Sequence, residues 1–282
     1  MLSAMLFDAH NHLQDTALAP HLGRIASSRA PQSLMVVNGT HPDDWPRVAE
    51  LAATLPFVLP SYGIHPWDAG SPRPDDWLEQ LASRLRTDPR ASVGEIGLDR
   101  WILDPSSANS PHLQGVRRAS MEEQIAVFVP QLRISAELNR AASIHCLRAF
   151  DDMLPLLRAT PHAERGFLLH AYGGPAALVP ELVRLGAYFS FNPSFLDPRK
   201  ERQRETFKVI PADRLLCETD APAMIPPQTW RTHKLPPAAD GSPVNHPGNI
   251  EAAYAGLAAV RGEDQASLVS RIAENFNRLF CS

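Results

Sequence analysis

The sequence predicts an α/β protein of the (β/α)8 TIM-barrel class, formed by one domain over residues 1–282. Short apolar runs, each bounded by polar residues, alternate along the chain with segments of helical periodicity, which is typical of parallel strands joined by crossover helices. Eight such units in 282 residues favour a closed barrel, and an open doubly wound sheet is the alternative. The expected strands are Met5–Phe7, Leu34–Asn38, Phe57–Ile64, Ser92–Ile96, Ala142–His145, Gly166–His170, Tyr188–Phe191 and Leu215–Glu218.

Helices are expected where apolar residues recur three or four positions apart. Such sets begin at Trp45, Trp77, Met121 and Leu178, and Pro130 should kink or break the third of these helices. Two stretches interrupt the alternation and predict insertion loops, residues 101–118 and the proline-rich residues 223–247.

Composition restricts the protein's class and location. The net charge of −4 and the pI of about 6.3 provide no general positive field for nucleic acid, although 24 of the 27 basic residues are arginine, a good phosphate ligand. Three cysteines indicate a reducing compartment. The N-terminus lacks the features of a signal peptide and no apolar run is long enough to span a membrane, so a cytoplasmic location is expected. Nothing in the sequence indicates an obligate protein partner.

Metal-binding side chains gather at the ends of the expected strands. They are His10, His12, Glu95, His145, His170 and Asp220. Each has an ordinary explanation alone, such as a surface histidine, an ion-paired glutamate or an aspartate that begins a turn. In a barrel, however, all these strand ends lie on the face that carries the active site. Their combination therefore predicts a metal centre.

The composition of this set predicts two divalent metal ions about 3.5–4 Å apart, bridged by a carboxylate. Four imidazoles favour zinc or manganese, whereas magnesium prefers more oxygen ligands. A water molecule acidified at such a site is a nucleophile for hydrolysis, and Asp220 could act as its general base.

Seven short motifs, taken in order, resemble the TatD family of metal-dependent deoxyribonucleases, which have amidohydrolase-like barrels. The motifs are Phe7-Asp8-Ala9-His10-Asn11-His12-Leu13, Gly63-Ile64-His65-Pro66, Gly94 to Asp99, Ser143-Ile144-His145-Cys146, His170-Ala171-Tyr172-Gly173-Gly174, Leu216 to Pro222, and Ile272-Ala273-Glu274-Asn275-Phe276. The resemblance implies that the first metal is held by His10, His12, Glu95 and Asp220, and the second by Glu95, His145 and His170. It also implies that Glu95 bridges the two and that His65 contacts a substrate phosphate.

The rim of the expected site departs from the family. Relatives usually carry arginine two residues after the fourth-motif histidine, whereas here Leu147 is followed by Arg148. Trp101 and Tyr172 could stack on a base of DNA, and Arg100 and Arg148 could contact phosphates, although aromatic residues at a barrel mouth are more often packing residues.

Three functions remain open from the sequence. The first is a nuclease that cleaves phosphodiester bonds of DNA. The second is a small-molecule amide or ester hydrolase on the same barrel, because metal-assisted water attack serves both reactions. The third is a catalytically silent metal-binding scaffold, which would have no need of both Glu95 and Asp220.

Overall fold

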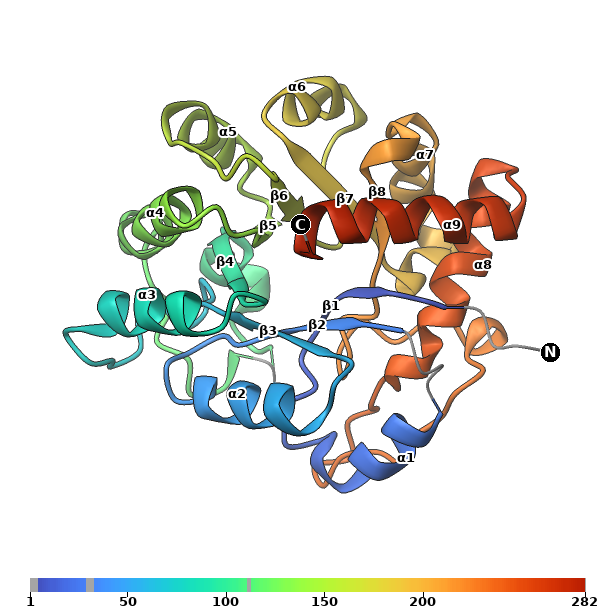
Figure 1. The fold of residues 1–282 in the computed structure, drawn as a ribbon, viewed down its shortest axis with the longest axis horizontal. Helices are drawn as coiled ribbons and strands as arrows, with labels where there is room; N and C mark the ends of the chain where they lie inside the picture. Colours follow the sequence, from blue (N-terminus) through green and yellow to red (C-terminus); the bar gives the residue numbers. More distant parts are fainter. Residues whose placement is uncertain (1–4, 29–32, 111–112, 282) are drawn as a thin grey trace.

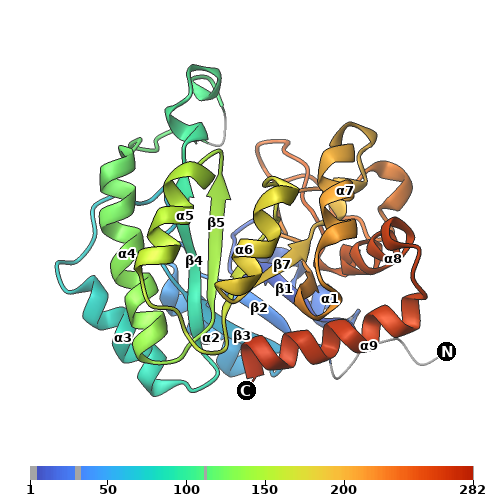
Figure 2. The ribbon, with the colours of Figure 1, turned by 90° about the horizontal axis from the view of Figure 1, so that it is seen from above.

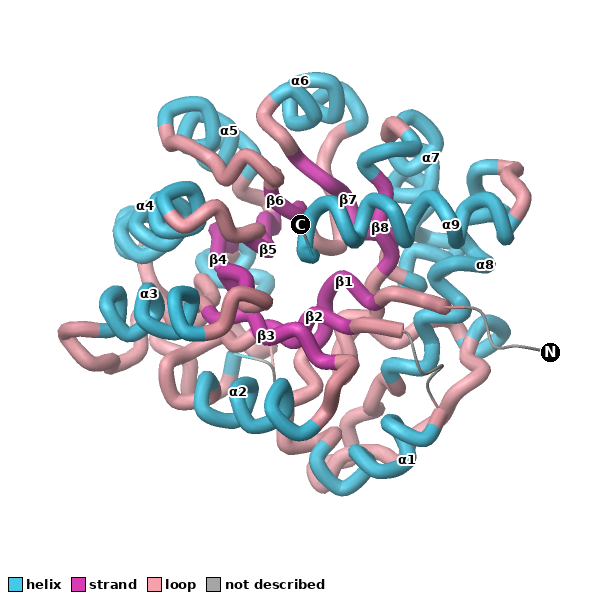
Figure 3. The backbone as a smooth tube through the Cα atoms, in the orientation of Figure 1, coloured by secondary structure: helices cyan, strands magenta, loops and turns pink. Residues whose placement is uncertain are grey.

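The computed structural model describes residues 5–28, 33–110 and 113–281, in which eight parallel strands form one sheet in chain order. Figures 1 and 3 show the strands as a central ring with helices around it, so the predicted (β/α)8 barrel is confirmed. The strands are β1 (Asp8–Asn11), β2 (Met35–Asn38), β3 (Val58–Tyr62), β4 (Ser92–Asp99), β5 (Ala142–Leu147), β6 (Phe167–Leu169), β7 (Ala187–Phe191) and β8 (Leu215–Cys217). The helices are α1 (Leu22–Ser27), α2 (Trp45–Thr54), α3 (Trp77–Thr87), α4 (Met121–Glu137), α5 (Phe150–Ala159), α6 (Val179–Arg184), α7 (Glu201–Val209), α8 (Ile250–Arg261) and α9 (Gln265–Phe276).

The ring closes between the first strand and the segment that follows the last. The backbone N–H of Asp220 donates to the His10 carbonyl at 2.9 Å, and that of His12 donates to the Ala221 carbonyl at 2.7 Å. These bonds continue the parallel ladder beyond the end of β8, and they place Asp220 beside His10 and His12.

One end of the barrel is covered by α9. The Asn275 side chain donates to the carbonyl of Leu215, where β8 begins, and the Phe276 ring packs 4.7 Å from that of Phe7. Figure 2 shows α9 crossing the end of the barrel from which the strands start. The carboxyl ends of the strands are therefore left to form the site.

The helices bury the faces that their periodicity predicts. In α2 the buried residues include Trp45, Val48 and Leu51. Helix α4 begins with a capping box between Ser120 and Glu123 and runs on past Pro130, so of the expected kink or break, the break is absent.

Three features differ from, or add to, the expectation. The first strand is Asp8–Asn11 rather than Met5–Phe7, because pairing with β2 begins at Asp8 and runs through the polar residues. The range 101–118 contains the short 3-10 turns Trp101–Leu103 and Pro105–Ser107, and 223–247 contains the 3-10 turn Gln228–Trp230. Among the described residues, no helix is both long and apolar enough to cross a membrane.

Candidate metal centre

The six expected metal ligands converge at the carboxyl ends of the strands. They come from β1, β4 and β5 and from the segments after β1, β6 and β8. Glu95 is at the centre and only 4% exposed, with Oε2 facing one group of side chains and Oε1 facing another.

The first group is formed by His10, His12 and Asp220 around Glu95 Oε2. The Nε2 atoms of His10 and His12 lie 3.3 Å apart, and Glu95 Oε2 is 3.5 and 3.1 Å from them. Asp220 Oδ1 is 3.7 Å from His10 Nε2 and 3.3 Å from His12 Nε2. Two nitrogens and two carboxylate oxygens thus point at one position.

The second group surrounds Glu95 Oε1. His170 Nε2 lies 2.8 Å from this oxygen, His145 Nδ1 3.0 Å and His65 Nε2 3.2 Å. The two oxygens of one carboxylate therefore face two adjacent positions, as a bridging ligand requires.

Hydrogen bonds on the far side of each ring determine which nitrogen is available to a metal. His12 Nδ1 is 2.8 Å from the Asn38 carbonyl oxygen, which can only accept, so Nδ1 carries the hydrogen and Nε2 is available. His145 Nε2 is 3.2 Å from Asp99 Oδ2, which leaves Nδ1 for the metal.

In the second group, carboxylates stand behind His145 and His170. His170 Nδ1 faces Glu218 Oε1 at 3.7 Å, whereas His10 Nδ1 lies 2.7 Å from the Ser143 hydroxyl. Glu218 is fully buried, accepts from the Ser190 hydroxyl and receives the Asn192 side-chain N–H at 3.2 Å. A hydrogen-bonded carboxylate makes a histidine a stronger ligand, as Asp99 does for His145, whereas Glu218 acts on His170 through its charge alone.

His65 differs from the other four histidines. It is near enough to form a possible ligand group with Glu95 and His145. Its Nδ1, however, accepts the backbone N–H of Trp67 at 3.1 Å, so Nε2 carries the hydrogen and donates toward Glu95. In this arrangement His65 is a hydrogen-bond donor rather than a ligand.

The donor set fits divalent metals, and its electrostatics show which protons a metal would displace. Burial raises the pKa of Glu95, but His65, His170 and His10 together more than offset this and hold the pKa well below its usual range. Burial lowers the pKa of His145, but Asp99 and Glu95 raise it to about 9. These shifts keep Glu95 ionised and His145 protonated near neutral pH, so a bound cation would displace the proton of His145.

Three of the residues expected to bind substrate lie on the rim. The guanidinium of Arg100 pairs with Asp152, and that of Arg148 pairs with Asp104 at 2.9 Å. The ring of half-buried Trp101 lies 6.0 Å from that of Trp67. The sequence had predicted no role for Trp67.

Tyr172 is in a different environment. It is 2% exposed, its hydroxyl donates to the Pro175 carbonyl at 2.9 Å, and its ring packs edge-on against Phe150 and Phe189. This burial counts against the expected stacking of Tyr172 on a base.

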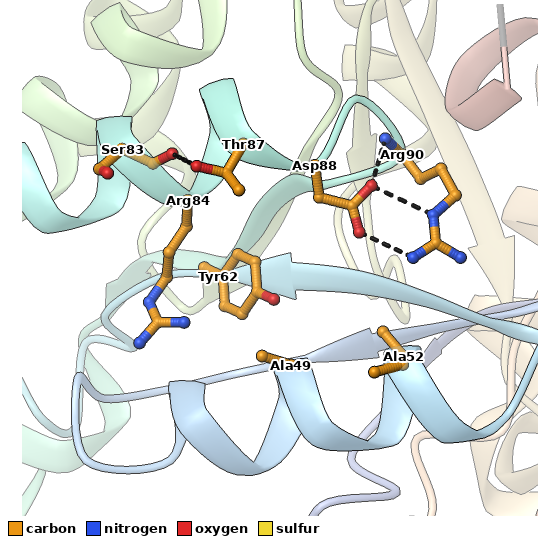
Figure 4. Close-up of a pocket in the computed structure, with 9 residues that line it drawn as sticks. Ala49, Ala52, Tyr62, Ser83, Arg84, Thr87, Asp88 and Arg90 are labelled. Atoms are coloured by element: carbon orange, nitrogen blue, oxygen red, sulfur yellow. Dashed lines mark hydrogen bonds and ion pairs between the residues drawn. The ribbon is translucent and has the colours of Figure 1, made fainter.

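A separate pocket of about 310 Å³ lies between α2 and α3 (Figure 4). Arg84 stacks over the Tyr62 ring there at 5.2 Å, and Asp88 pairs with Arg90. None of the expected metal ligands lines this pocket, so it is not part of the metal centre.

Comparison with known proteins identifies the class. The model of the TatD related DNase family matches residues 7–281, so this chain belongs to that family. It is 26% identical over 98% of its length to an uncharacterized metal-dependent hydrolase, YabD, of Bacillus subtilis (strain 168), and covers 99% of that protein. It is 30% identical over 87% of its length to the 3'-5' ssDNA/RNA exonuclease TatD of Klebsiella pneumoniae (strain 342), covering 86% of it.

A solved structure has a similar fold. The crystal structure of YjjV, a TatD homologue from Escherichia coli K12, superposes with a TM-score of 0.81 and 23% identity, with 100% of each chain covered. The protein is a TatD-type metal-dependent hydrolase, as the sequence predicted.

Proposed function

We propose that this hydrolase is a nuclease that cleaves phosphodiester bonds of single-stranded nucleic acid with two divalent metal ions. The observation that carries the proposal is the position of Glu95, whose two carboxylate oxygens face two groups of histidines. The nucleic-acid substrate is supported by the relatives named as ssDNA/RNA exonucleases, which include the 30% identical Klebsiella protein.

The metal ligands are proposed as follows. His10, His12 and Asp220 would hold one ion, His145 and His170 the other, and Glu95 both. Zinc or manganese is favoured over magnesium because four of the ligands are imidazoles. Bound ions of this kind acidify a water molecule and stabilise negative charge on phosphate oxygens.

Asp220 is proposed to orient the attacking water and to accept its proton. Burial raises the pKa of this carboxyl group, but the hydrogen bond to His12 and the charges of His12, His10 and His170 together outweigh burial and keep the pKa below its ordinary value. Asp220 is therefore ionised near neutral pH, as a general base must be.

His65 is proposed to donate its Nε2 hydrogen to a nonbridging phosphate oxygen. The backbone of Trp67 fixes the required tautomer, and Nε2 already points at an anionic oxygen, that of Glu95. A phosphate next to the second metal position would offer the same kind of acceptor.

The rim would hold the rest of the strand. Arg100 and Arg148 can exchange their partners Asp152 and Asp104 for phosphates at little cost, because half-exposed ion pairs are worth only about 0–1 kcal/mol. Trp101 would stack on a base.

A cytoplasmic location of the protein, expected from the sequence, stays a prediction.

A small-molecule amide or ester hydrolase is the second candidate, favoured by the net charge of −4 and by rim arginines that are already paired. A silent scaffold has less support, because the chain belongs to a family of hydrolases and has a complete set of candidate ligands.

The deciding experiment is cleavage of end-labelled single-stranded and 3'-recessed DNA by protein stripped of metal and reloaded with manganese, zinc or magnesium. Glu95→Ala and a chelator serve as controls. Cleavage that needs metal and Glu95 supports the nuclease. Absence of cleavage with every metal, together with hydrolysis of a small ester or amide, would favour the second candidate.

A further inference from the structure

We propose that Trp67 is a positioning residue for the metal centre, which fixes His145 through Asp99. The inference rests on the metal centre in the proposed function, but not on the identity of the substrate. Trp67 follows the His65-Pro66 motif after β3 and is half-buried between His65 and Trp101.

The indole of Trp67 and the ring of His145 share one carboxylate oxygen. Trp67 Nε1 donates to Asp99 Oδ2 at 2.6 Å, and His145 Nε2 lies 3.2 Å from the same oxygen. Asp99 is completely buried at the end of β4, where solvent cannot replace a lost donor. The Trp67 hydrogen bond therefore sets the direction in which Oδ2 faces His145.

The other oxygen of Asp99 is bound to the rim. Asp99 Oδ1 accepts the backbone N–H of Trp101 at 2.8 Å and that of Ile102 at 3.3 Å. Without the indole, the Asp99 carboxylate would still accept hydrogen bonds at Oδ1. It could, however, rotate about its χ2 torsion, for which a broad range of angles is allowed. The ring of His145, whose Nδ1 points at Glu95, would then lose a fixed orientation.

Trp67 also fixes His65, through a different hydrogen. Its backbone N–H donates to His65 Nδ1, while its indole N–H acts on His145 through Asp99. One residue thus fixes the tautomer of His65 and, through Asp99, the orientation of His145. A substitution of the Trp67 side chain removes the indole bond to Asp99 and leaves the backbone bond to His65.

Trp67→Phe separates these roles, because it keeps an aromatic ring and the backbone hydrogen bond to His65. Trp101→Phe is the matched control. It makes the same change at the same mouth, but the Trp101 indole has no hydrogen-bond partner among the described residues, and its bond to Asp99 comes from the backbone.

The experiment is a titration of the metal-free, full-length proteins with Co²⁺, followed by visible absorption, and with Mn²⁺, followed by calorimetry. Removing the direct partner of a ligating histidine typically weakens metal binding roughly 10- to 100-fold. Trp67 is one hydrogen bond further from the metal than the direct partner Asp99. We therefore expect roughly three- to tenfold weaker binding of one of the two ions in Trp67→Phe, with a changed Co²⁺ spectrum. Trp101→Phe should retain the parent's affinity and spectrum.

Equal metal affinities and Co²⁺ spectra for Trp67→Phe and the parent protein would overturn the proposal. A change in Trp101→Phe as large as that in Trp67→Phe would also overturn it. If Trp67→Phe does not fold, Asp99→Asn tests the same connection and should weaken binding at least as much; parent-like binding in it would also overturn the proposal. No nucleic acid enters these titrations. A protein that cleaves no DNA or RNA would therefore refute the proposed function and leave this result unaffected.

Discussion

Glu95→Gln tests the bridging role of Glu95 with the smallest change of shape. The substitution keeps the size of the side chain but removes a negative charge that both groups of histidines share. Oε2 lies 3.1 Å from His12 Nε2 and Oε1 lies 2.8 Å from His170 Nε2. Metal ions seated among these atoms would each be within about 4 Å of the carboxylate.

The size of the effect follows from Coulomb's law. At an effective dielectric constant of about 20, two unit charges about 4 Å apart interact by roughly 4 kcal/mol, which is a lower bound for a divalent ion because it carries two charges. A loss of this size corresponds to about a 1,000-fold decrease in affinity. Since Glu95 faces both positions, binding of both ions should weaken.

Calorimetric titration of the metal-free protein with Mn²⁺ measures this directly. Glu122→Gln, an exposed glutamate in α4, is the matched control and should bind as the parent does. Binding by Glu95→Gln within tenfold of the parent at both positions would refute a bridging carboxylate. Weakening at one position only would show that Glu95 serves a single ion.

Three further predictions concern Asp220 as general base, the effect of bound metal on thermal stability, and the proton on His145. Asp220→Asn should keep the circular dichroism spectrum and lower kcat about 10²- to 10⁴-fold at saturating metal, the range for loss of a general base; steady-state kinetics with kcat within threefold of the parent would exclude this role. Chelation should lower the Tm by about 5–10 °C relative to protein in Mn²⁺ at 100 times Kd, a stabilisation of about 2.7 kcal/mol; scanning fluorimetry with no shift would contradict it. The pKa of His145, raised from 6.5 to about 9 by Asp99 and Glu95, means that its stabilisation of the metal-free fold is complete below about pH 6.5 and is lost as pH rises through 9. Because a metal must displace that proton, metal affinity should rise between pH 6.5 and 8.5 with proton release, and calorimetry in buffers of different ionisation enthalpy that finds neither would contradict it.

The barrel and the convergence of the expected ligands could be predicted because they depend on simple regularities. Strand order follows from alternation of apolar runs and helical segments, and strand ends in a barrel share one face. The boundary of the first strand was wrong for an instructive reason. Asp8 and His10 are polar and fully buried, so they interrupt the apolar pattern at the point where the strand serves the site.

The residues that hold the ligands in place could not be predicted in the same way. Asp99 acts through a side-chain hydrogen bond to His145, and Glu218 acts through its negative charge beside His170; neither contact has a signature in spacing along the chain. Glu218, two positions before Asp220 and last in an expected strand, offered the one available signal: a buried carboxylate needs a partner. Tyr172 shows the opposite error, since its hydroxyl is satisfied by the nearby Pro175 carbonyl and its ring belongs to the core.

The most direct test of the account is anomalous X-ray diffraction from crystals soaked in Mn²⁺, measured at the manganese edge. A two-metal centre should give two peaks about 3.5–4 Å apart on either side of the Glu95 carboxylate, one beside His12 and Asp220 and the other beside His145 and His170. A single peak, or peaks remote from Glu95, would contradict it.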